Sequence, residues 1–484
     1  MKKLNILALA DIHYVGTANH ICSLKDRKTK LALELIQRVL HSVDMDKIDV
    51  IFLMGDLVDN GDAPGAEDDM KSINSELKRT GKPLIVVPGN HDHSDSMVFE
   101  IFDDYEGIHD IKGYQILTFA DEYCENDVTV RSIEKMEKVF SGVDPERPVI
   151  TLQHNPIYPH IDSPYPYNLI NAKEVMEYYT QKGVTLSVSG HAHRGVEPMV
   201  RDNVGYLTCP ALCEEPFKYT IITMDYRTYD VQVYSLKPEG VNLSDLHVHT
   251  GYAYCSIGME TSRSIDRAKE LGLQRIAFTE HAGHLYVSRD DYRSSRIINE
   301  PDIIQKNRNT PLNRMKSYRG EMEKYRSGSV LIGLEVDLDC NGNLTLLEED
   351  RYGWDILIGA VHYLPERYEK GSKEGFMWAS EALLRQGVDV LAHPFRYFTR
   401  NNLTVPTELY EPLAELLAHY KTAVELNYHT YQNDPVFFEM CIERGILISL
   451  GSDAHLTYQV GQLDRHLEFL KQICPLEKLP DILY

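Results

Sequence analysis

The 484-residue sequence has few basic residues for its length. Lysine and arginine together number 50 against 73 aspartates and glutamates, which gives a formal net charge of -23. A protein that binds nucleic acid gains affinity by neutralising phosphates with cationic side chains. The charge therefore argues against nucleic acid as a partner. Small phosphorylated substrates remain compatible with it, because bound divalent cations would reduce the negative charge locally.

The sequence also lacks long apolar runs and paired cysteines. No segment approaches the roughly 18 uninterrupted apolar residues of a transmembrane helix. The apolar run near Met1 is too short for a signal peptide and leads straight into Asp11, so it is interpreted as a first buried strand. The eight cysteines form no C-x-x-C pair, which fits a reduced compartment better than a disulfide framework. We expect a cytoplasmic protein that does not associate with membranes.

Short apolar runs alternate with amphipathic stretches along most of the chain, the pattern of α/β architecture. In the first half the apolar runs are 6–10, 50–54, 84–87, 149–152 and 186–188. A strand-like segment rich in Tyr, Thr and Ile follows at 206–234, and then a polar Pro/Gly break at 235–240. The sequence therefore predicts two domains, residues 1–238 and 241–484.

The alternation restarts in the second half. Strand-like runs end at His247, Thr279, Val336, Val361, Ala392, Leu426 and Leu450. Helical stretches, including 262–271, 380–386 and 409–419, separate several of them. Seven strands with helical crossovers predict a barrel-like sheet.

Five short motifs in the first half contain side chains that bind metals. They are Asp11-Ile12-His13, the segment from Gly55 to Gly61 that contains Asp56 and Asp59, Gly89-Asn90-His91-Asp92, His154, and Gly190-His191-Ala192-His193. Each follows an apolar strand, where α/β folds gather their ligand-binding loops. Mixed carboxylate oxygens and imidazole nitrogens suit Mn, Fe or Zn better than Mg or Ca. A carboxylate such as Asp56 can bridge two ions about 3.5–4 Å apart, which can activate a water and hold a phosphoryl group in line.

With these motifs, residues 1 to about 235 resemble the calcineurin-like metallophosphoesterases. The resemblance implies a four-layer α/β/β/α sandwich with two ions. It assigns Asp11, His13 and His193 to one ion, Asn90, His154 and His191 to the other, and Asp56 to both. It also implies that His91 protonates the leaving oxygen and that Asp59 orients it. Imidazole is the side chain that titrates nearest to neutral pH, which suits a proton donor.

One position departs from that family's protein phosphatases. They carry an arginine that clamps phosphate after the second Asp of the G-D-x-x-D motif, and here that position is Asn60. This favours the small-molecule branch of the family, which includes cyclic-nucleotide phosphodiesterases. Asn155 follows His154 where a second histidine is frequent, which leaves the subfamily open.

The second half carries another ordered set of histidines and carboxylates. Its motifs contain His247 and His249, His281, Glu335, His362, His393, and Asp453 with His455. Residues i and i+2 of a strand face the same side, so His247 and His249 can bind one ion together, and Asp453 and His455 repeat that geometry. The other members also sit at strand ends, as at the catalytic face of a parallel barrel.

This set resembles the PHP family, named for polymerase and histidinol phosphatase, over residues 241 to 484. The resemblance implies a distorted (β/α)7 barrel with two to three clustered ions, in which these eight residues are ligands and Glu335 bridges. Family members usually carry a further His, Asp or Glu shortly after the H-x-H motif. This chain has Cys255-Ser256-Ile257 there, with Glu260 the nearest carboxylate. A third ion could be weakly held, bound through Glu260, or absent.

Several arginines of the second half could bind substrate phosphate, because guanidinium makes bidentate contacts with it. Arg396, two residues beyond Pro394, is the best placed. Arg289, Arg293 and Arg296 follow the Glu280-His281 motif, although a solvated, charged excursion is the favoured interpretation of that segment.

The leading hypothesis is metal-dependent hydrolysis of small phosphate mono- or diesters, such as nucleotides or cyclic nucleotides, at two separate sites. In the alternatives the chain is a nuclease, against which its charge counts, or only one domain is catalytic. In that last case the PHP half is the better candidate for a regulatory metal-binding module. The substrate, the physiological metal and the oligomeric state stay open.

Overall fold

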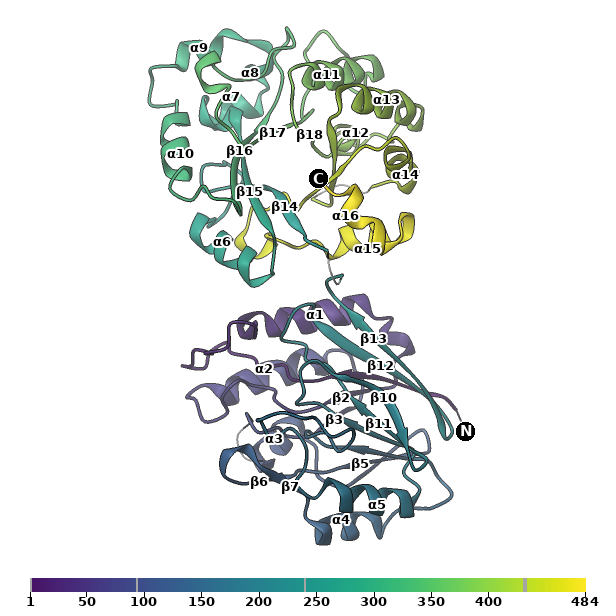
Figure 1. Ribbon diagram of the computed structural model, residues 1–484. Coiled ribbons are helices and arrows are strands. Elements are labelled where there is room, and N and C mark those ends of the chain that lie inside the picture. The colour runs from purple at the N-terminus through teal and green to yellow at the C-terminus, as the bar shows by residue number, and fades with distance from the viewer. Residues whose placement is uncertain (1, 93–94, 239–240, 430–432) are drawn as a thin grey trace. The chain divides into compact units, whose positions relative to one another are not determined.

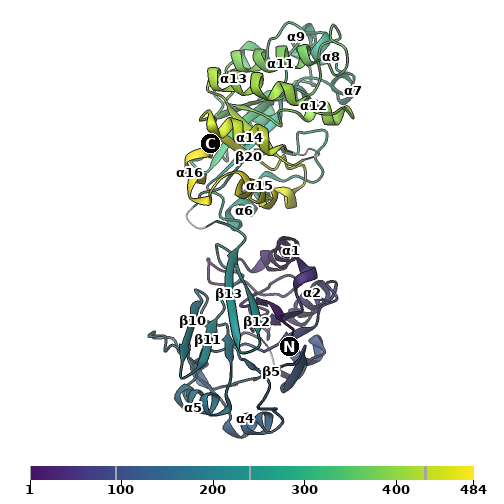
Figure 2. The same cartoon turned by 90° about the vertical axis from the view of Figure 1, so that its right-hand side faces the viewer.

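The computed structural model describes residues 2–92, 95–238, 241–429 and 433–484. The chain divides into two compact units, Met1–Glu239 and Gly240–Tyr484 (Figures 1 and 2). Among the described residues, no helix combines the length and the apolarity needed to cross a membrane.

The first unit contains two large sheets. The five-stranded sheet has the order β13 (Thr228–Ser235), β12 (Lys218–Asp225), β1 (Leu4–Leu9), β2 (Val50–Leu53), β3 (Leu84–Val86). The six-stranded sheet has the order β10 (Val196–Arg201), β11 (Val204–Thr208), β9 (Leu186–Ser189), β8 (Val149–Leu152), β5 (Tyr114–Thr118), β4 (Ile108–Ile111). Strands β1, β2 and β3 run parallel, as do β5, β8, β9 and β11. A further pair, β6 (Glu122–Tyr123) and β7 (Thr129–Val130), is antiparallel.

The two sheets face each other across a shared apolar core. Alternate residues of β1, such as Leu4 and Ile6, pack in one cluster with Ile150 of β8 and Val188 of β9, as the two-residue period of a strand requires. The opposite face of the six-stranded sheet packs against α4 (Ile133–Phe140) and α5 (Ala172–Lys182).

Helices α1 (Ala32–Ser42) and α2 (Ala66–Lys78) complete the sandwich on the outer side of the five-stranded sheet, and α3 (Asp95–Phe102) follows β3 (Figures 1 and 2). Leu7 and Ile51, on the strand faces opposite the shared core, are fully buried. The four-layer α/β/β/α architecture is confirmed.

The second unit is a nearly closed parallel barrel. Its seven strands run in chain order: β14 (Ser244–Val248), β15 (Arg275–His281), β16 (Val330–Val336), β17 (Ile356–Gly359), β18 (Val390–Leu391), β19 (Ala423–Asn427), β20 (Ile448–Gly451). The ends of the sheet meet through a parallel bridge between Val248 and Ala454. The Asp453 N–H donates to the His247 carbonyl at 2.8 Å, just beyond the end of β20. The predicted seven-stranded barrel is confirmed.

Helices surround this barrel. They are α6 (Thr261–Glu270), α7 (Arg289–Arg293), α8 (Arg296–Asn299), α9 (Asp302–Asn307), α10 (Met315–Met322), α11 (Lys373–Arg385), α12 (Arg396–Arg400), α13 (Tyr410–Tyr420), α14 (Pro435–Glu443), α15 (Asp464–Ile473) and α16 (Leu479–Ile482). Phe278 and Leu334 pack with Leu383 of α11 and Leu417 of α13 in the outer core. The alternate residues of those strands, including Ala277 and Glu335, therefore face the barrel interior.

The expected helices and strands correspond to observed ones, and their ends differ by up to seven residues. The expected strand ending at Val361 stops at Gly359, and the helix expected from residue 380 begins at Lys373. Strand β18 has only two residues, because its neighbours pair with it only at Val390 and Leu391. Within the expected break at 235–240, Glu239 and Gly240 lie outside the described residues.

We expect residues 1–238 and 241–484 to fold as separate proteins, because the apolar clusters of each unit contain residues of that unit alone. Each fragment should be soluble and should unfold in one cooperative thermal transition, measured by circular dichroism. Aggregation of either fragment, or loss of its transition, would show that the units depend on each other.

Candidate metal centres

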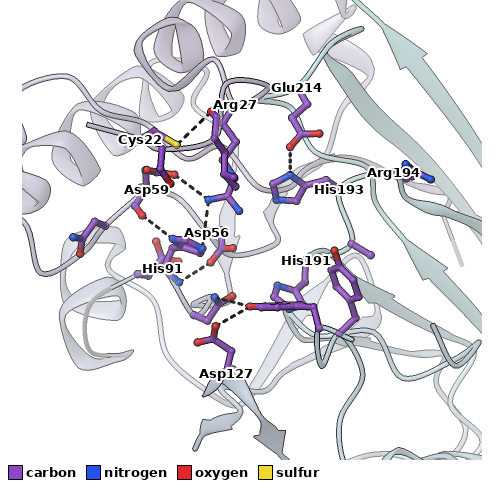
Figure 3. Close-up of a pocket in the computed structure, with 18 of the residues that line it drawn as sticks. Cys22, Arg27, Asp56, Asp59, His91, Asp127, His191, His193, Arg194 and Glu214 are labelled. Carbon is purple, nitrogen blue, oxygen red and sulfur yellow. Dashed lines mark hydrogen bonds and ion pairs between the residues drawn. The ribbon is translucent and has the colours of Figure 1, made fainter. Parts of the chain in front are cut away.

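The candidate ligands of the first unit come from loops that leave the carboxyl ends of parallel strands in both sheets. Asp11 and His13 follow β1, Asp56 follows β2, Asn90 follows β3, His154 follows β8, and His191 and His193 follow β9. The two sheets thus bring together residues up to 182 positions apart, from Asp11 to His193, and Figure 3 shows Asp56, His191 and His193 around one cavity.

The backbone of these loops is held in an uncommon conformation. Asp11, His13 and Asp56 have positive φ angles of 51°, 48° and 51°, which non-glycine residues rarely adopt. At Gly89 an added Cβ would lie 2.2 Å from Asp56 Oδ1, so only glycine fits beside that carboxylate. Strained residues of this kind concentrate at functional sites.

Asp56 lies between two groups of imidazoles. Its Oδ2 is 3.5 Å from His13 Nε2 and 3.2 Å from His154 Nε2. On one side, His13 Nε2 and His193 Nε2 are 3.2 Å apart; on the other, His154 Nε2 and His191 Nδ1 are 3.1 Å apart. The His193 ring also lies 3.4 Å from Asp11 Oδ1. This is the arrangement expected of a carboxylate shared by two cations.

In three of these imidazole rings, Nδ1 points away from the cluster and contacts an oxygen acceptor. His13 Nδ1 lies 3.2 Å from Asp59 Oδ1, and His154 Nδ1 donates to the Met54 carbonyl at 2.7 Å. His193 Nδ1 lies 2.6 Å from Glu214 Oε1. Such contacts set the tautomer and leave Nε2 as the free ligand atom facing the cluster. The sequence motifs did not point to Glu214.

Charge compensation inside the cluster is strong. Burial opposes ionisation of Asp56, but the positive charges of His154 and His13 outweigh it and hold its pKa well below the usual value. Burial likewise disfavours the charged form of His193, yet Asp11 and Glu214 raise its pKa to about 10. Protons thus balance the carboxylates in the metal-free protein, and bound cations would displace them.

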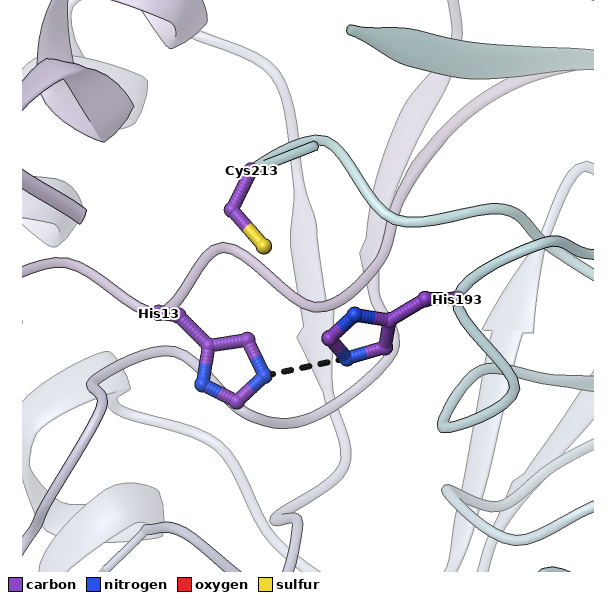
Figure 4. Close-up of side chains that lie close together, drawn as sticks. All are labelled: His13, His193 and Cys213. Carbon is purple, nitrogen blue, oxygen red and sulfur yellow. Dashed lines mark hydrogen bonds between the residues drawn. The ribbon is translucent and has the colours of Figure 1, made fainter. Parts of the chain in front are cut away.

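Cys213 lies beside the His13 and His193 rings (Figure 4) and could complete a metal-binding group with them. Burial raises the pKa of its thiol well above the usual value. Because the thiolate is the metal-binding form, Cys213 is a weaker candidate than the imidazoles around it.

His91 faces the cavity above this cluster, and Asp59 contacts it through its main chain. Its Nδ1 donates to the main-chain carbonyl of Asp59 at 2.6 Å, while the Asp59 carboxylate contacts His13, His20 and Arg27 instead. Arg27 Nη1 is 3.0 Å from that carboxylate and 3.4 Å from His91 Nε2 (Figure 3). Arg27, which no motif identified, therefore places a guanidinium in this cavity although Asn60 replaces the arginine of the protein phosphatases.

In the second unit the candidate ligands gather around Glu335, at the end of β16. Glu335 Oε1 lies 3.0 Å from His393 Nε2 and 3.4 Å from His362 Nε2. Glu335 Oε2 lies 2.5 Å from His281 Nδ1, and on the same side it is 3.7 Å from His247 Nε2 and 3.9 Å from His249 Nε2. The two oxygens of one carboxylate thus face two separate groups of histidines.

A second carboxylate, Asp453, joins the His247 side of this cluster. Its Oδ1 lies 3.0 Å from His249 Nε2 and 3.7 Å from His247 Nε2. His455 Nδ1 donates to the Asp453 carbonyl at 2.7 Å. Arg396 Nη1 donates to Asp453 Oδ2 at 2.6 Å, which fixes its guanidinium beside the cluster.

Carboxylates behind the histidines orient this cluster too. His247 Nδ1 lies 2.7 Å from Glu425 Oε1, and His362 Nδ1 lies 2.9 Å from Asp337 Oδ1. Glu425 lies within β19, a strand that the sequence predicted without a functional residue.

Glu260 does not approach this cluster. It precedes α6 with a half-exposed side chain, and it pairs with Arg263 at 2.9 Å. Cys255 instead lies with His281 and His284 in a group that could hold an ion. The Tyr254 N–H donates to His284 Nδ1 at 3.2 Å, so neutral His284 carries its proton on Nε2.

The residues of both clusters fit divalent cations. Asn90 Oδ1, His191 Nε2 and His247 Nε2 are buried without a hydrogen-bond partner among the described residues. Buried polar atoms are rarely left unpaired, and bound cations would satisfy these three. The mixed nitrogen and oxygen donors suit transition metals.

Comparison with known families agrees with this division. The model of the calcineurin-like phosphoesterase family matches residues 4–195, and that of the PHP domain matches residues 245–429. The chain therefore joins a calcineurin-like phosphoesterase domain to a PHP domain. By family it is a metal-dependent phosphoesterase, a hydrolase.

Individual relatives are distant. A protein of Acetivibrio thermocellus named "Probable phosphatase" is 22% identical over 243 residues, 47% of this chain and 86% of the relative. One of Fibrobacter succinogenes named "Probable cyclic nucleotide phosphodiesterase" is 24% identical over 217 residues, 43% of this chain and 79% of the relative. A solved dimetal phosphatase from Danio rerio, 13% identical, covers 48% of this chain and 98% of its own, with a TM-score of 0.37.

Glu214→Gln should weaken metal binding at the N-terminal cluster by about 10–100-fold, because it removes the carboxylate that orients His193. The measurement is Mn²⁺ titration by electron paramagnetic resonance, in a Glu335→Gln background that disables the second cluster. Glu215→Gln is the matched control, since Glu215 pairs with Lys237 instead. Equal affinities in the two variants would contradict this role of Glu214.

Proposed function

We propose that the chain hydrolyses small phosphate mono- or diesters at two separate metal centres, one in each unit. The observation that carries this proposal is the repeated arrangement of one buried carboxylate between two groups of imidazoles, around Asp56 and around Glu335. A carboxylate so placed suits a pair of divalent ions. Two buried sites of this kind, each under a cavity, are more than structural stability requires.

Divalent ions bound there would lower the pKa of a water molecule and polarise a phosphoryl oxygen. Under this proposal Asp11, His13 and His193 hold one ion of the N-terminal pair, and Asn90, His154 and His191 hold the other. In the C-terminal centre the ligands are His247, His249, His281, His362, His393, Asp453 and His455, with Glu335 bridging. The metals would be Mn, Fe or Zn, given the donor set.

At the N-terminal centre the chain's own residues would bind phosphate and move a proton. Arg27 presents its guanidinium beside His91 and would donate bidentate hydrogen bonds to the phosphate oxygens of the substrate. His91 donates through Nδ1 to the Asp59 carbonyl and directs Nε2 to the cavity, so its doubly protonated form would give the Nε2 proton to the leaving oxygen. At the C-terminal centre Arg396 is the corresponding phosphate-binding residue.

Cyclic nucleotides are candidate substrates of the N-terminal centre. The support is Asn60 in place of the protein-phosphatase arginine, together with a relative named as a cyclic nucleotide phosphodiesterase. The described lining of the cavity over the C-terminal cluster contains arginines and no acidic residue, which suits an anionic substrate and favours a catalytic role for that unit over a purely regulatory one.

The purified, Mn- or Fe-supplied protein should hold about four transition-metal ions per chain, two in each centre. Asp56→Asn and Glu335→Gln should each remove about two, because each variant weakens one bridging carboxylate. Plasma mass spectrometry of the anaerobically purified proteins gives these numbers. A wild-type content near two would mean that one of the clusters does not bind metal.

His91→Ala should lower turnover at the N-terminal centre by about 10²–10⁴-fold on an alkyl phosphate ester while metal content is retained. The assay uses the Glu335→Gln background, so that only this centre acts. A 4-nitrophenyl ester is the matched control, because its leaving group needs no proton and the variant should lose little activity on it. The same loss on both esters would exclude a proton donor.

A further inference from the structure

The cavity above the C-terminal cluster has an unusual charge for this chain. It encloses about 740 Å³, and its described lining contains four arginines and no aspartate or glutamate. The cavity above the N-terminal cluster is lined by six acidic residues and two arginines. In a chain with a net charge of -23, a cavity whose permanently charged described lining is all arginine favours anions.

The four arginines form two pairs on short helices. Arg289 and Arg293 are four residues apart on α7, and Arg396 and Arg400 are four residues apart on α12. Residues with this spacing share one face of a helix. Two helices that are distant in sequence thus present paired guanidinium groups to one cavity.

The arginines differ in what already holds them. Arg396 is bound to Asp453, and its side chain is only 14% exposed. Arg400 donates to the Tyr363 hydroxyl at 3.1 Å and lies over that ring. Arg289 and Arg293 are exposed, and neither makes an ion pair or a side-chain hydrogen bond within the described part of the chain.

Arg296 shows that pairing is available in this segment. It lies three residues beyond Arg293, forms ion pairs with Asp291 and Glu300, and does not line the cavity. Arg289 and Arg293 therefore keep their hydrogen-bonding groups free on the cavity side. Guanidinium groups bind phosphate through bidentate, charge-assisted hydrogen bonds.

We propose that the C-terminal centre acts on small phosphate esters that carry a second phosphate. The scissile phosphate lies beside Glu335 and Arg396, and the second is held by Arg289 and Arg293. This rests on the proposed hydrolytic function of that centre. Water adds across the scissile P–O bond: its oxygen goes to phosphorus and a proton to the leaving oxygen. The released alcohol keeps the second phosphate. The cavity volume lies within the range of small-molecule sites.

The test compares mono- and bisphosphates of the same alcohol, such as butanediol, a pentose and a nucleoside. The full chain with Asp56→Asn is used, so that the N-terminal centre does not contribute. For at least one of these alcohols kcat/KM should be about tenfold higher for the bisphosphate, mainly through KM, as expected for charge-assisted hydrogen bonds on a partly screened rim. In the double variant Arg289→Ala/Arg293→Ala the ratio of the two kcat/KM values should fall to about one. Arg289→Lys/Arg293→Lys should keep part of the preference for the bisphosphate. Arg296→Ala, the matched control, should leave the ratio unchanged.

Isothermal titration of the same proteins with the same pairs separates this inference from the proposed function. If none of the compounds is hydrolysed, the proposed hydrolytic function of the centre is wrong. The relative affinities for mono- and bisphosphate still decide whether the arginines bind a second phosphate. Equal affinity for mono- and bisphosphate, or a preference that survives the double alanine variant, would overturn the second-phosphate site.

Discussion

The structure of both units depends on one electrostatic constraint, the burial of several carboxylates and imidazoles in contact with one another. Removing such groups from water is costly unless their charges are compensated. Asp56 and Glu335 are almost fully buried, and each carboxylate lies between two groups of histidines. The positive φ angles, the glycine at position 89 and the carboxylates behind the rings all serve to hold that contact in place.

Two unrelated folds meet the constraint in the same way. In the sandwich, loops from both sheets supply the ligands, whereas in the barrel they come from the ends of strands within one sheet. In each, oxygen acceptors behind the rings hold the outer nitrogens, as Glu214 does for His193 and Glu425 for His247. What differs is the space above: acidic residues surround the first cluster, and arginines surround the second. The two candidate metal centres are therefore alike in their side chains, while the cavities above them differ in charge.

Much of this was predictable from the sequence, because motifs such as Gly190-His191-Ala192-His193 follow apolar strands in the right order. The alternation of apolar and amphipathic stretches predicted α/β architecture and the barrel of the second half, whereas the four-layer sandwich followed from the family resemblance. Residues that reach the clusters from distant segments of the sequence were not predictable. Glu214 contacts His193 across 21 positions, and Arg27 reaches Asp59 across 32, from segments without a recognisable pattern. Likewise, nothing in the sequence separates Arg293 from Arg296, since their difference lies in which neighbours they meet after folding.

The closure of the barrel has a mechanical consequence. Its first and last strands, β14 and β20, close the barrel through few backbone hydrogen bonds. The Asp453 N–H donates to the His247 carbonyl, and the His249 N–H donates to the Ala454 carbonyl beside the Val248–Ala454 bridge. The candidate ligands His247 and His249 lie in or just after β14, and Asp453 and His455 follow β20. An ion bound by residues from both strands would hold the two ends of the sheet together. Loss of metal would then loosen the barrel where these two strands meet, because the candidate metal centre and the closure of the barrel depend on the same residues.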